Sequence, residues 1–222
     1  EIYIRGEKVQ ISSPNHAAKL NIGMVHQHFK LVPDYTITGN IILGVEPIKK
    51  FAGIFPYVDI RGANRKIEEL SKNFGLEVDP TKKIEDLTVS MQQRVEILKV
   101  LYREAEILIF DEPTAVLTPQ EIDFLLNIIE GLRNGGKTII LITHKLEEIK
   151  KVADRCAVLN KGKLVDVLDV KETSINHMAQ LMVGREVSFE AEKAPAHFKE
   201  EVLKVEHLTV KNEQGFEVVK DV

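Results

Sequence analysis

A short apolar run that ends in two acids places the strongest constraint on the fold. Every residue from Ile107 to Phe110 is apolar, as expected of a strand buried on both faces of a parallel sheet. Asp111 and Glu112 follow at once, and Pro113 ends the strand. Ligands of open α/β sheets bind at the carboxyl ends of the strands. The run therefore predicts an acidic site at such an edge.

Other strands and helices alternate around this run. Thr138 to Thr143 has the pattern of a second buried strand, and Arg155 to Leu159 that of another strand. Lys145 to Val152 lies between them and is predicted to be helical. The alternation predicts an α/β fold with a largely parallel sheet.

Three further helices are expected between these strands. One spans Arg65 to Phe74 and is closed by Gly75. A long amphipathic helix follows Leu87 to Ser90, and its apolar positions have a period of 3.6: Met91, Val95, Leu98, Leu101 and Tyr102. The third begins with a cap, a first-turn proline and a capping-box acid, and it ends at a glycine pair: Thr118, Pro119, Glu121, Gly135 and Gly136.

Composition narrows the class of protein. Of the 222 residues, 44% are hydrophobic, enough for a real core, and the formal net charge of -4 argues against a dedicated nucleic-acid binder. Cys156 is the single cysteine, which excludes an intrachain disulfide and fits a reducing cytoplasm. No apolar run approaches the length of a membrane span, and no signal peptide is visible. The chain opens in a strand-like stretch, Glu1 to Arg5, and ends in another at Val222, so both ends are expected to be cuts through a longer gene.

One motif matches a phosphate-binding loop in letters only. Gly131 to Thr138 fits the Walker A pattern. A working P-loop follows a strand and opens a helix, so that backbone N–H groups meet the phosphates. Here a helix precedes the segment and a strand follows it. The segment is therefore interpreted as a helix C-cap, a tight turn and a strand start.

Four other features can carry chemistry. Asp111 can hold Mg²⁺ and Glu112 can orient and polarise an attacking water, although solvated acids at a strand end are a common alternative. Thr143-His144 closes the next strand, where a histidine can contact a γ-phosphate or can simply be an ordinary strand-end residue. Ser90 and Gln93 are expected to form a capping box at a helix start, whose N–H groups favour anions. The plain alternative is a well-capped helix.

Gln27 is the fourth feature. It ends the short apolar stretch that begins at Ile22 and precedes a loop punctuated by prolines. Its amide can reach a metal or a water and can still move with the loop. His26 and His28 flank it as a possible metal pair, but the sequence offers no third ligand nearby.

In this order the features resemble the ABC ATPase family. The likeness runs through a Q-loop at Gln27, a signature segment at 87–91, a Walker B motif at 107–112 and an H-loop at His144. Four stretches are most similar to the tandem-domain import ATPases for simple sugars and nucleosides: 23–29, 94–99, 111–121 and 181–186.

The resemblance implies a P-loop NTPase-like ABC ATPase core with a mostly parallel sheet plus a helical subdomain at about 36–104. Residues 1–189 would form a first nucleotide-binding domain without its P-loop, and 190–201, charged and containing Pro195, would be a linker. Residues 202–222 would open a second nucleotide-binding domain, its strand-like part running from Val202 to Val210. The Walker A loop and an adenine-stacking aromatic residue would lie before residue 1, so the chain alone is expected to hydrolyse ATP negligibly.

The resemblance also implies roles for the site residues. Glu112 would activate water, Asp111 and Gln27 would serve Mg²⁺, and His144 would contact the γ-phosphate of ATP. Thr88 and Ser90 would touch ATP held by another nucleotide-binding domain.

The implied setting is the cytoplasmic face of the cell membrane, where the chain would be peripheral. It would power import of a sugar or nucleoside through membrane permease subunits, with a second nucleotide-binding domain beside it and an extracytoplasmic solute-binding protein as an indirect partner. No nucleic-acid partner is implied.

Two positions depart from the family pattern. Ser90 stands where the signature has glycine, and Thr118 occupies the usual aspartate place of the D-loop. Two other functions remain open. One is a soluble ABC protein of DNA repair or translation, and the other is a non-catalytic regulatory ABC domain.

Overall fold

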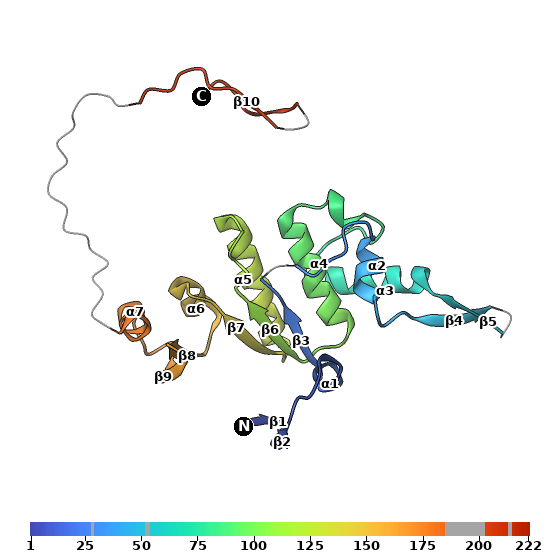
Figure 1. Ribbon diagram of the computed structural model, residues 1–222, viewed down its shortest axis with the longest axis horizontal. Coiled ribbons are helices and arrows are strands. Elements are labelled where there is room, and N and C mark those ends of the chain that lie inside the picture. The colour runs from blue at the N-terminus through green and yellow to red at the C-terminus, as the bar shows by residue number, and fades with distance from the viewer. Residues whose placement is uncertain (28, 52–53, 185–202, 213–214) are drawn as a thin grey trace. The chain divides into compact units, whose positions relative to one another are not determined.

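The computed structural model describes residues 1–222 except 28, 52–53, 185–202 and 213–214 (Figure 1). The chain divides into two compact units, residues 1–187 and 188–222, each of which is described by itself. Among the described residues no helix is both long and apolar enough to span a bilayer. The predicted linker at 190–201 lies outside the described residues.

A parallel sheet of three strands forms the centre of the first unit. Its strands are β3 (Ile22–Val25), β6 (Ile107–Asp111) and β7 (Thr138–Ile142), and β6 lies in the middle. Both pairings are parallel. The prediction of an α/β fold with a parallel sheet is confirmed.

The two faces of this sheet differ in burial. Leu108 and Phe110 of β6 are fully buried and belong to the main core. In β7, however, Ile140 and Ile142 are about half exposed. The expectation that β7 is a buried strand is wrong for one of its faces, because no described element covers that face. The alternating pattern follows from strand geometry, in which successive side chains point to opposite faces.

The long helix α4 (Val89–Tyr102) packs against β3. Gly23 permits a close approach there, because a Cβ atom at this position would lie 2.9 Å from the Cβ atoms of both Val100 and Ala105. The helix is buried on more than one side, since Gln93 and Glu96 are buried along with its apolar residues. The prediction of a simply amphipathic helix is therefore wrong: other helices cover its second side.

Those neighbours are the helices of the predicted helical subdomain. α2 (Ile37–Ile42) and α3 (Ile60–Asn73) both pack on α4, and η1 (Ile84–Asp86) precedes it. α3 begins at Ile60 rather than at Arg65, because the Asp59 side chain caps it by accepting the Gly62 N–H at 3.1 Å. Between α2 and α3 lies an antiparallel hairpin of β4 (Ile48–Phe51) and β5 (Phe55–Val58). In Figure 1 this hairpin extends away from the helices.

Helix α5 (Pro119–Asn134) begins and ends as predicted. Thr118 and Glu121 form the capping box, and Gly135 is the C-cap. Gly136 has a φ of +87°, and β7 starts two residues later. The Walker A look-alike is thus a helix end and a turn, as its context predicts. Its lysine, Lys137, donates to the backbone carbonyl of Ala105.

The remaining elements of the first unit follow or precede this core in the sequence. α6 (Leu146–Val152) follows β7, then an antiparallel pair of β8 (Arg155–Asn160) and β9 (Lys163–Asp169), then α7 (Ile175–Val183). At the N-terminal end, β1 (Ile2–Ile4) pairs with β2 (Glu7–Val9), and α1 (Pro14–Lys19) leads into β3.

The second unit contains one described strand pair. β10 (Val210–Lys211) is antiparallel to β11 (Glu217–Val219). Residues 203–209 are not a strand, so the prediction of a strand running to Val210 is wrong for them, and Val202 lies outside the described residues. These residues are largely exposed. Leu208 exchanges two backbone hydrogen bonds with Val222, and the side chains of His207 and Thr209 both bond to Asp221.

Candidate functional site

The strand register brings the predicted site residues to one edge of the sheet. Val25 lies opposite Phe110, and Asp111 lies opposite Ile142. Because all three strands are parallel, the residues that follow them lie at the same carboxyl edge. These are Gln27, the pair Asp111 and Glu112, and the pair Thr143 and His144.

Glu112 and His144 meet directly at this edge. Nδ1 of His144 is 2.8 Å from Oε1 of Glu112. The backbone N–H of Glu112 donates to the carbonyl of Ile142 at 2.9 Å, which holds the two loops together. Glu112 also has a φ of +45°, a left-handed conformation that non-glycine residues adopt rarely and that often marks functional sites.

The two side chains differ in exposure. The Glu112 side chain is 21% exposed and that of His144 is 68% exposed. The second carboxylate oxygen of Glu112, Oε2, is buried and has no hydrogen-bond partner among the described residues. Buried polar atoms are normally satisfied by protein, water or ligand. This oxygen is therefore a buried acceptor that no described group of the chain satisfies.

The direction of the hydrogen bond between His144 and Glu112 follows from the chemistry of an ionised carboxylate. An ionised carboxylate only accepts hydrogen bonds, so Nδ1 must carry the proton that Glu112 accepts. In the imidazolium form Nε2 carries a proton as well, and it can then donate to a second anion. Its high exposure leaves that second nitrogen accessible from outside the chain.

The acids also fit a magnesium ion. No group of three or more His, Cys, Asp or Glu ligands is found in the described part of the chain, which includes His26 but not His28. Mg²⁺ does not need such a group, because it commonly takes one or two carboxylates together with substrate phosphates and water. Asp111, at the end of β6, supplies a carboxylate of that kind. No described hydrogen bond joins Gln27 to Asp111.

The signature segment is built differently from the prediction. Thr88, not Ser90, is the N-cap of α4, and its hydroxyl accepts the Met91 N–H at 3.4 Å. Ser90 lies inside the first turn, so the predicted Ser90–Gln93 capping box is wrong. Gln93 is buried and donates instead to the backbone carbonyl of Pro113. Extended backbone at Thr88 suits a cap, whereas helical backbone at Ser90 does not.

Ser90 makes two side-chain contacts. Its hydroxyl is 3.3 Å from that of Thr88, and it also hydrogen-bonds the Glu121 carboxylate at the start of α5. The Thr118 backbone N–H and the Ser90 and Thr118 hydroxyls together lower the pKa of Glu121. A cavity of about 240 Å³ lies beside these contacts, between α4 and α5. No described contact joins Thr88 or Ser90 to Glu112 or His144.

Sequence reasoning missed several residues around the edge. Lys145 donates to both oxygens of Thr114 and pairs with Glu148. On the other side, buried Glu96 of α4 accepts the Lys30 N–H at 2.7 Å and so anchors the loop after Gln27. No local pattern signals the Lys145–Thr114 and Glu96–Lys30 contacts, because each joins residues far apart in the sequence.

Comparison with known proteins places the chain in a family. The ABC transporter family profile matches residues 1–115. The chain is 52% identical to the nucleoside import ATP-binding protein NupA of Lactococcus lactis subsp. cremoris over 99% of this chain and 42% of that protein. It is 54% identical to the guanosine import ATP-binding protein NupO of Bacillus subtilis over 100% of this chain and 42% of that protein. The chain thus spans less than half the length of these curated relatives.

Solved structures agree on the fold. CbiO1 from Clostridium perfringens, part of the ABC transporter complex cbiONQ, aligns with a TM-score of 0.62 and 23% identity, covering 82% of this chain and 68% of that one. The ATP-binding cassette MJ0796, bound to ADP and Pi, aligns with a TM-score of 0.60 and 22% identity, covering 76% and 72%. Sequence, sheet topology and strand-edge motifs lead to the same assignment: the chain belongs to the ABC transporter family.

Proposed function

We propose that this chain is the ATP-hydrolysing part of an importer for a sugar or a nucleoside. The observation that carries the proposal is the Glu112–His144 contact of 2.8 Å at the sheet edge, with a buried acceptor oxygen left unpartnered on Glu112. Relatives named as nucleoside, ribose and glucose import ATP-binding proteins support the transport role and the solute class.

Glu112 acts on the attacking water. Its Oε1 is occupied by His144, so Oε2 is the oxygen free to accept a water proton. A water held there is oriented and polarised toward a phosphorus atom placed beyond the strand ends. Phosphoryl transfer relies mainly on such positioning and on charge stabilisation.

His144 links the base to the phosphate. Its Nδ1 bonds to Glu112, and when both ring nitrogens carry protons Nε2 can donate to a γ-phosphate oxygen. The ring thereby fixes the distance between the water-orienting carboxylate and the group under attack. In that doubly protonated form the ring would also offset charge that develops on the phosphate oxygens.

Asp111 and Gln27 hold the magnesium ion that accompanies ATP. When bound, Mg²⁺ neutralises phosphate charge. Asp111 supplies a carboxylate from the end of β6, and Gln27 supplies a neutral amide oxygen from the loop after β3. Because Glu96 anchors this loop to α4, a change at Gln27 can be passed to the helical subdomain.

Thr88 and Ser90 face ATP that is held by a second nucleotide-binding domain. They lie at the N-terminus of α4, where free N–H groups and the helix dipole favour an anion. The hydroxyl of Thr88 is engaged as the N-cap, so backbone N–H groups of the first turn are the main donors toward phosphate. Closure of two such domains on ATP would drive the permease.

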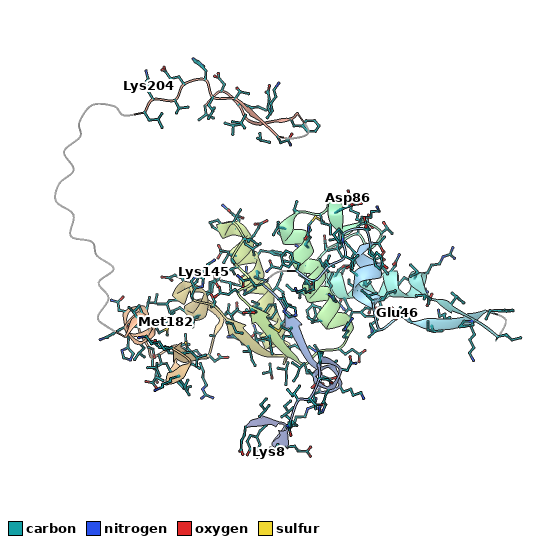
Figure 2. All side chains as sticks on the ribbon, viewed as in Figure 1. Lys8, Glu46, Asp86, Lys145, Met182 and Lys204 are labelled. Carbon is teal, nitrogen blue, oxygen red and sulfur yellow. The ribbon has the colours of Figure 1, made fainter. Side chains whose placement is uncertain are left out.

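The β4–β5 hairpin is the surface that we assign to the permease. Its apolar side chains are largely exposed: Ile48, Ile54, Phe55, Tyr57 and Val58. Glu46, labelled in Figure 2, lies just before the hairpin. Exposed apolar groups that gather on one element mark interaction sites. The hairpin belongs to the helical subdomain, between α2 and α3 in the chain. In this proposal the chain is peripheral at the cytoplasmic face of the membrane.

Glu112→Gln tests the proposal in a polypeptide that joins this chain to a P-loop segment and its permease. The amide keeps the size of the acid but does not take up a proton. We expect ATP binding, measured by calorimetry, to persist while ATP turnover and solute uptake into vesicles fall by about 10²-fold or more. Turnover at the unchanged rate would remove Glu112 from its role.

A further inference from the structure

We propose that Lys145 is a positioning residue that holds His144 against Glu112. Lys145 follows His144 directly, and Thr114 lies two residues after Glu112. The Lys145–Thr114 bridge therefore connects the same two loops, after β6 and after β7, as the Glu112–His144 contact does. The inference rests on the proposed ATPase function, because positioning matters only where these two side chains act together.

The bridge consists of two hydrogen bonds from one ammonium group. Nζ of Lys145 donates to the backbone carbonyl of Thr114 at 3.0 Å and to its hydroxyl at 3.0 Å. Thr114 is fully buried, so its carbonyl is out of reach of bulk water. A buried carbonyl gains more from a charged donor than an exposed one does. Lys145 thus ties the loop that follows β6 to the loop that follows β7.

Glu148 provides the countercharge and directs the ammonium. Its side chain is only 4% exposed, and Oε1 lies 3.4 Å from the Lys145 Nζ. The other oxygen accepts the Thr143 hydroxyl at 3.1 Å, and the Thr143 hydroxyl oxygen in turn accepts the Lys145 backbone N–H at 3.1 Å. Both residues that flank His144 are therefore held by one network on the first turn of α6. Figure 2 labels Lys145, just before that helix.

His144 needs such support because little else restrains it. Its side chain is 68% exposed, and its one described hydrogen bond is to Glu112. Glu112 itself lies in a left-handed backbone conformation, which persists only where neighbouring contacts hold it. The Lys145–Thr114 bridge joins the backbone just after Glu112 to the residue just after His144, and so restrains both loops. Neither lysine nor threonine needs to touch ATP for this effect.

The chain offers a matched control in Lys150. It lies on α6, the helix that begins directly after Lys145, and its Nζ donates to two backbone carbonyls, those of Val170 at 2.6 Å and Thr173 at 3.0 Å. Those partners lie away from Glu112, at the end of β9 and beyond. Lys145→Met and Lys150→Met each remove an ammonium that bonds backbone carbonyls, but only the first removes a bond between the two loops.

The test compares both variants in the polypeptide that carries a P-loop. We expect Lys145→Met to lower kcat for ATP by roughly tenfold to a hundredfold with KM little changed, because small misplacements of catalytic groups have effects of this size. Lys150→Met is expected to keep kcat. In the chain itself, we expect the ¹⁵N chemical shifts of the His144 ring nitrogens to change in Lys145→Met and to stay the same in Lys150→Met.

A milder pair of variants covers the case in which Lys145→Met does not fold. Thr114→Val removes one acceptor of the bridge at nearly constant volume, and Thr114→Ser keeps it. A kcat that falls in the first and stays in the second supports the inference. Equal kcat in both members of each pair would overturn it. Glu112→Gln separates the two hypotheses: if it also leaves turnover intact, the proposed ATPase site itself fails.

Discussion

The sheet edge and the β4–β5 hairpin differ in which kind of side chain they bury. At the edge, most polar groups have partners within the chain, although Oε2 of Glu112 has none, and Thr114 and Glu148 are almost fully enclosed. On the hairpin, apolar groups have few partners, and Phe55 is 66% exposed. Enclosing polar groups costs free energy unless each is paired, and exposing apolar ones forgoes the gain of burial. The edge is thus organised before a ligand arrives, while the hairpin retains apolar area for contact with another surface.

Substitution of one phenylalanine in each region tests this difference most directly. Phe110 in β6 is 0% exposed and lies in the main core, whereas Phe55 in β5 lies mostly in solvent. We expect Phe110→Ala to lower the free energy of unfolding by about 3–5 kcal/mol, because it leaves a cavity among packed side chains. Phe55→Ala is expected to change it by less than about 0.5 kcal/mol. Urea unfolding followed by circular dichroism gives both values, and similar losses would erase the contrast between the regions.

His144 tests the chemical half of the comparison. In the polypeptide with a P-loop, His144→Ala is expected to slow ATP turnover by about 10²-fold, since it removes the group that joins Glu112 to the phosphate. Unfolding should barely change, because the side chain is largely exposed. Steady-state ATPase rates beside thermal melts provide the check. A variant that lost stability and kept its rate would mean that the contact is structural.

Thr118 tests how far order near the edge depends on helix caps. Its hydroxyl accepts the Glu121 N–H at 3.4 Å, and the Glu121 carboxylate accepts the Thr118 N–H at 2.9 Å. Thr118→Ala is expected to cost about 1 kcal/mol of unfolding free energy. Thr118→Ser, which retains the hydroxyl, should cost much less. Denaturant midpoints for the two variants decide the point, and equal midpoints would deny the cap its role.

Ser90→Gly is expected to have a small effect on stability. Glycine in the first turn of α4 should cost roughly 0.5 kcal/mol, while the loss of the Cβ and hydroxyl should let phosphate approach the helix more closely and raise ATPase activity. The pKa of Glu121, lowered partly by Ser90, should rise toward its ordinary value.

The sign of the pH effect follows from that shift. A carboxylate whose pKa is lower in the folded state adds stability above its unfolded pKa, and this stability is lost as the pH falls through the folded value. Ser90→Gly should therefore weaken the acid-range pH dependence of the melting temperature. Unchanged or lower ATPase activity would show that the signature already works with serine.

Local sequence patterns determined much of this protein. The strand at 107–111 with its two acids, the capping box at Thr118 and Glu121 and the turn at Gly135 and Gly136 were all predictable. Each depends on residues within about one helical turn or one strand of each other. The order of elements around the Walker A look-alike, a helix before it and a strand after it, is also a local pattern, and it excluded this segment as a phosphate-binding loop. The roles of Glu112, His144, Asp111 and Gln27 remain predictions that rest on family resemblance.

Tertiary structure decided what the local patterns could not. Gln93 was expected to cap its own helix, but it is buried and bonds Pro113, 20 residues away. Lys145 reaches Thr114 across 31 residues, and no local periodicity marks either partner. One face of β7 stays exposed although its sequence is as apolar as that of β6. Burial and side-chain pairing depend on which elements pack together, and that arrangement is set by the whole fold rather than by any short stretch of the chain.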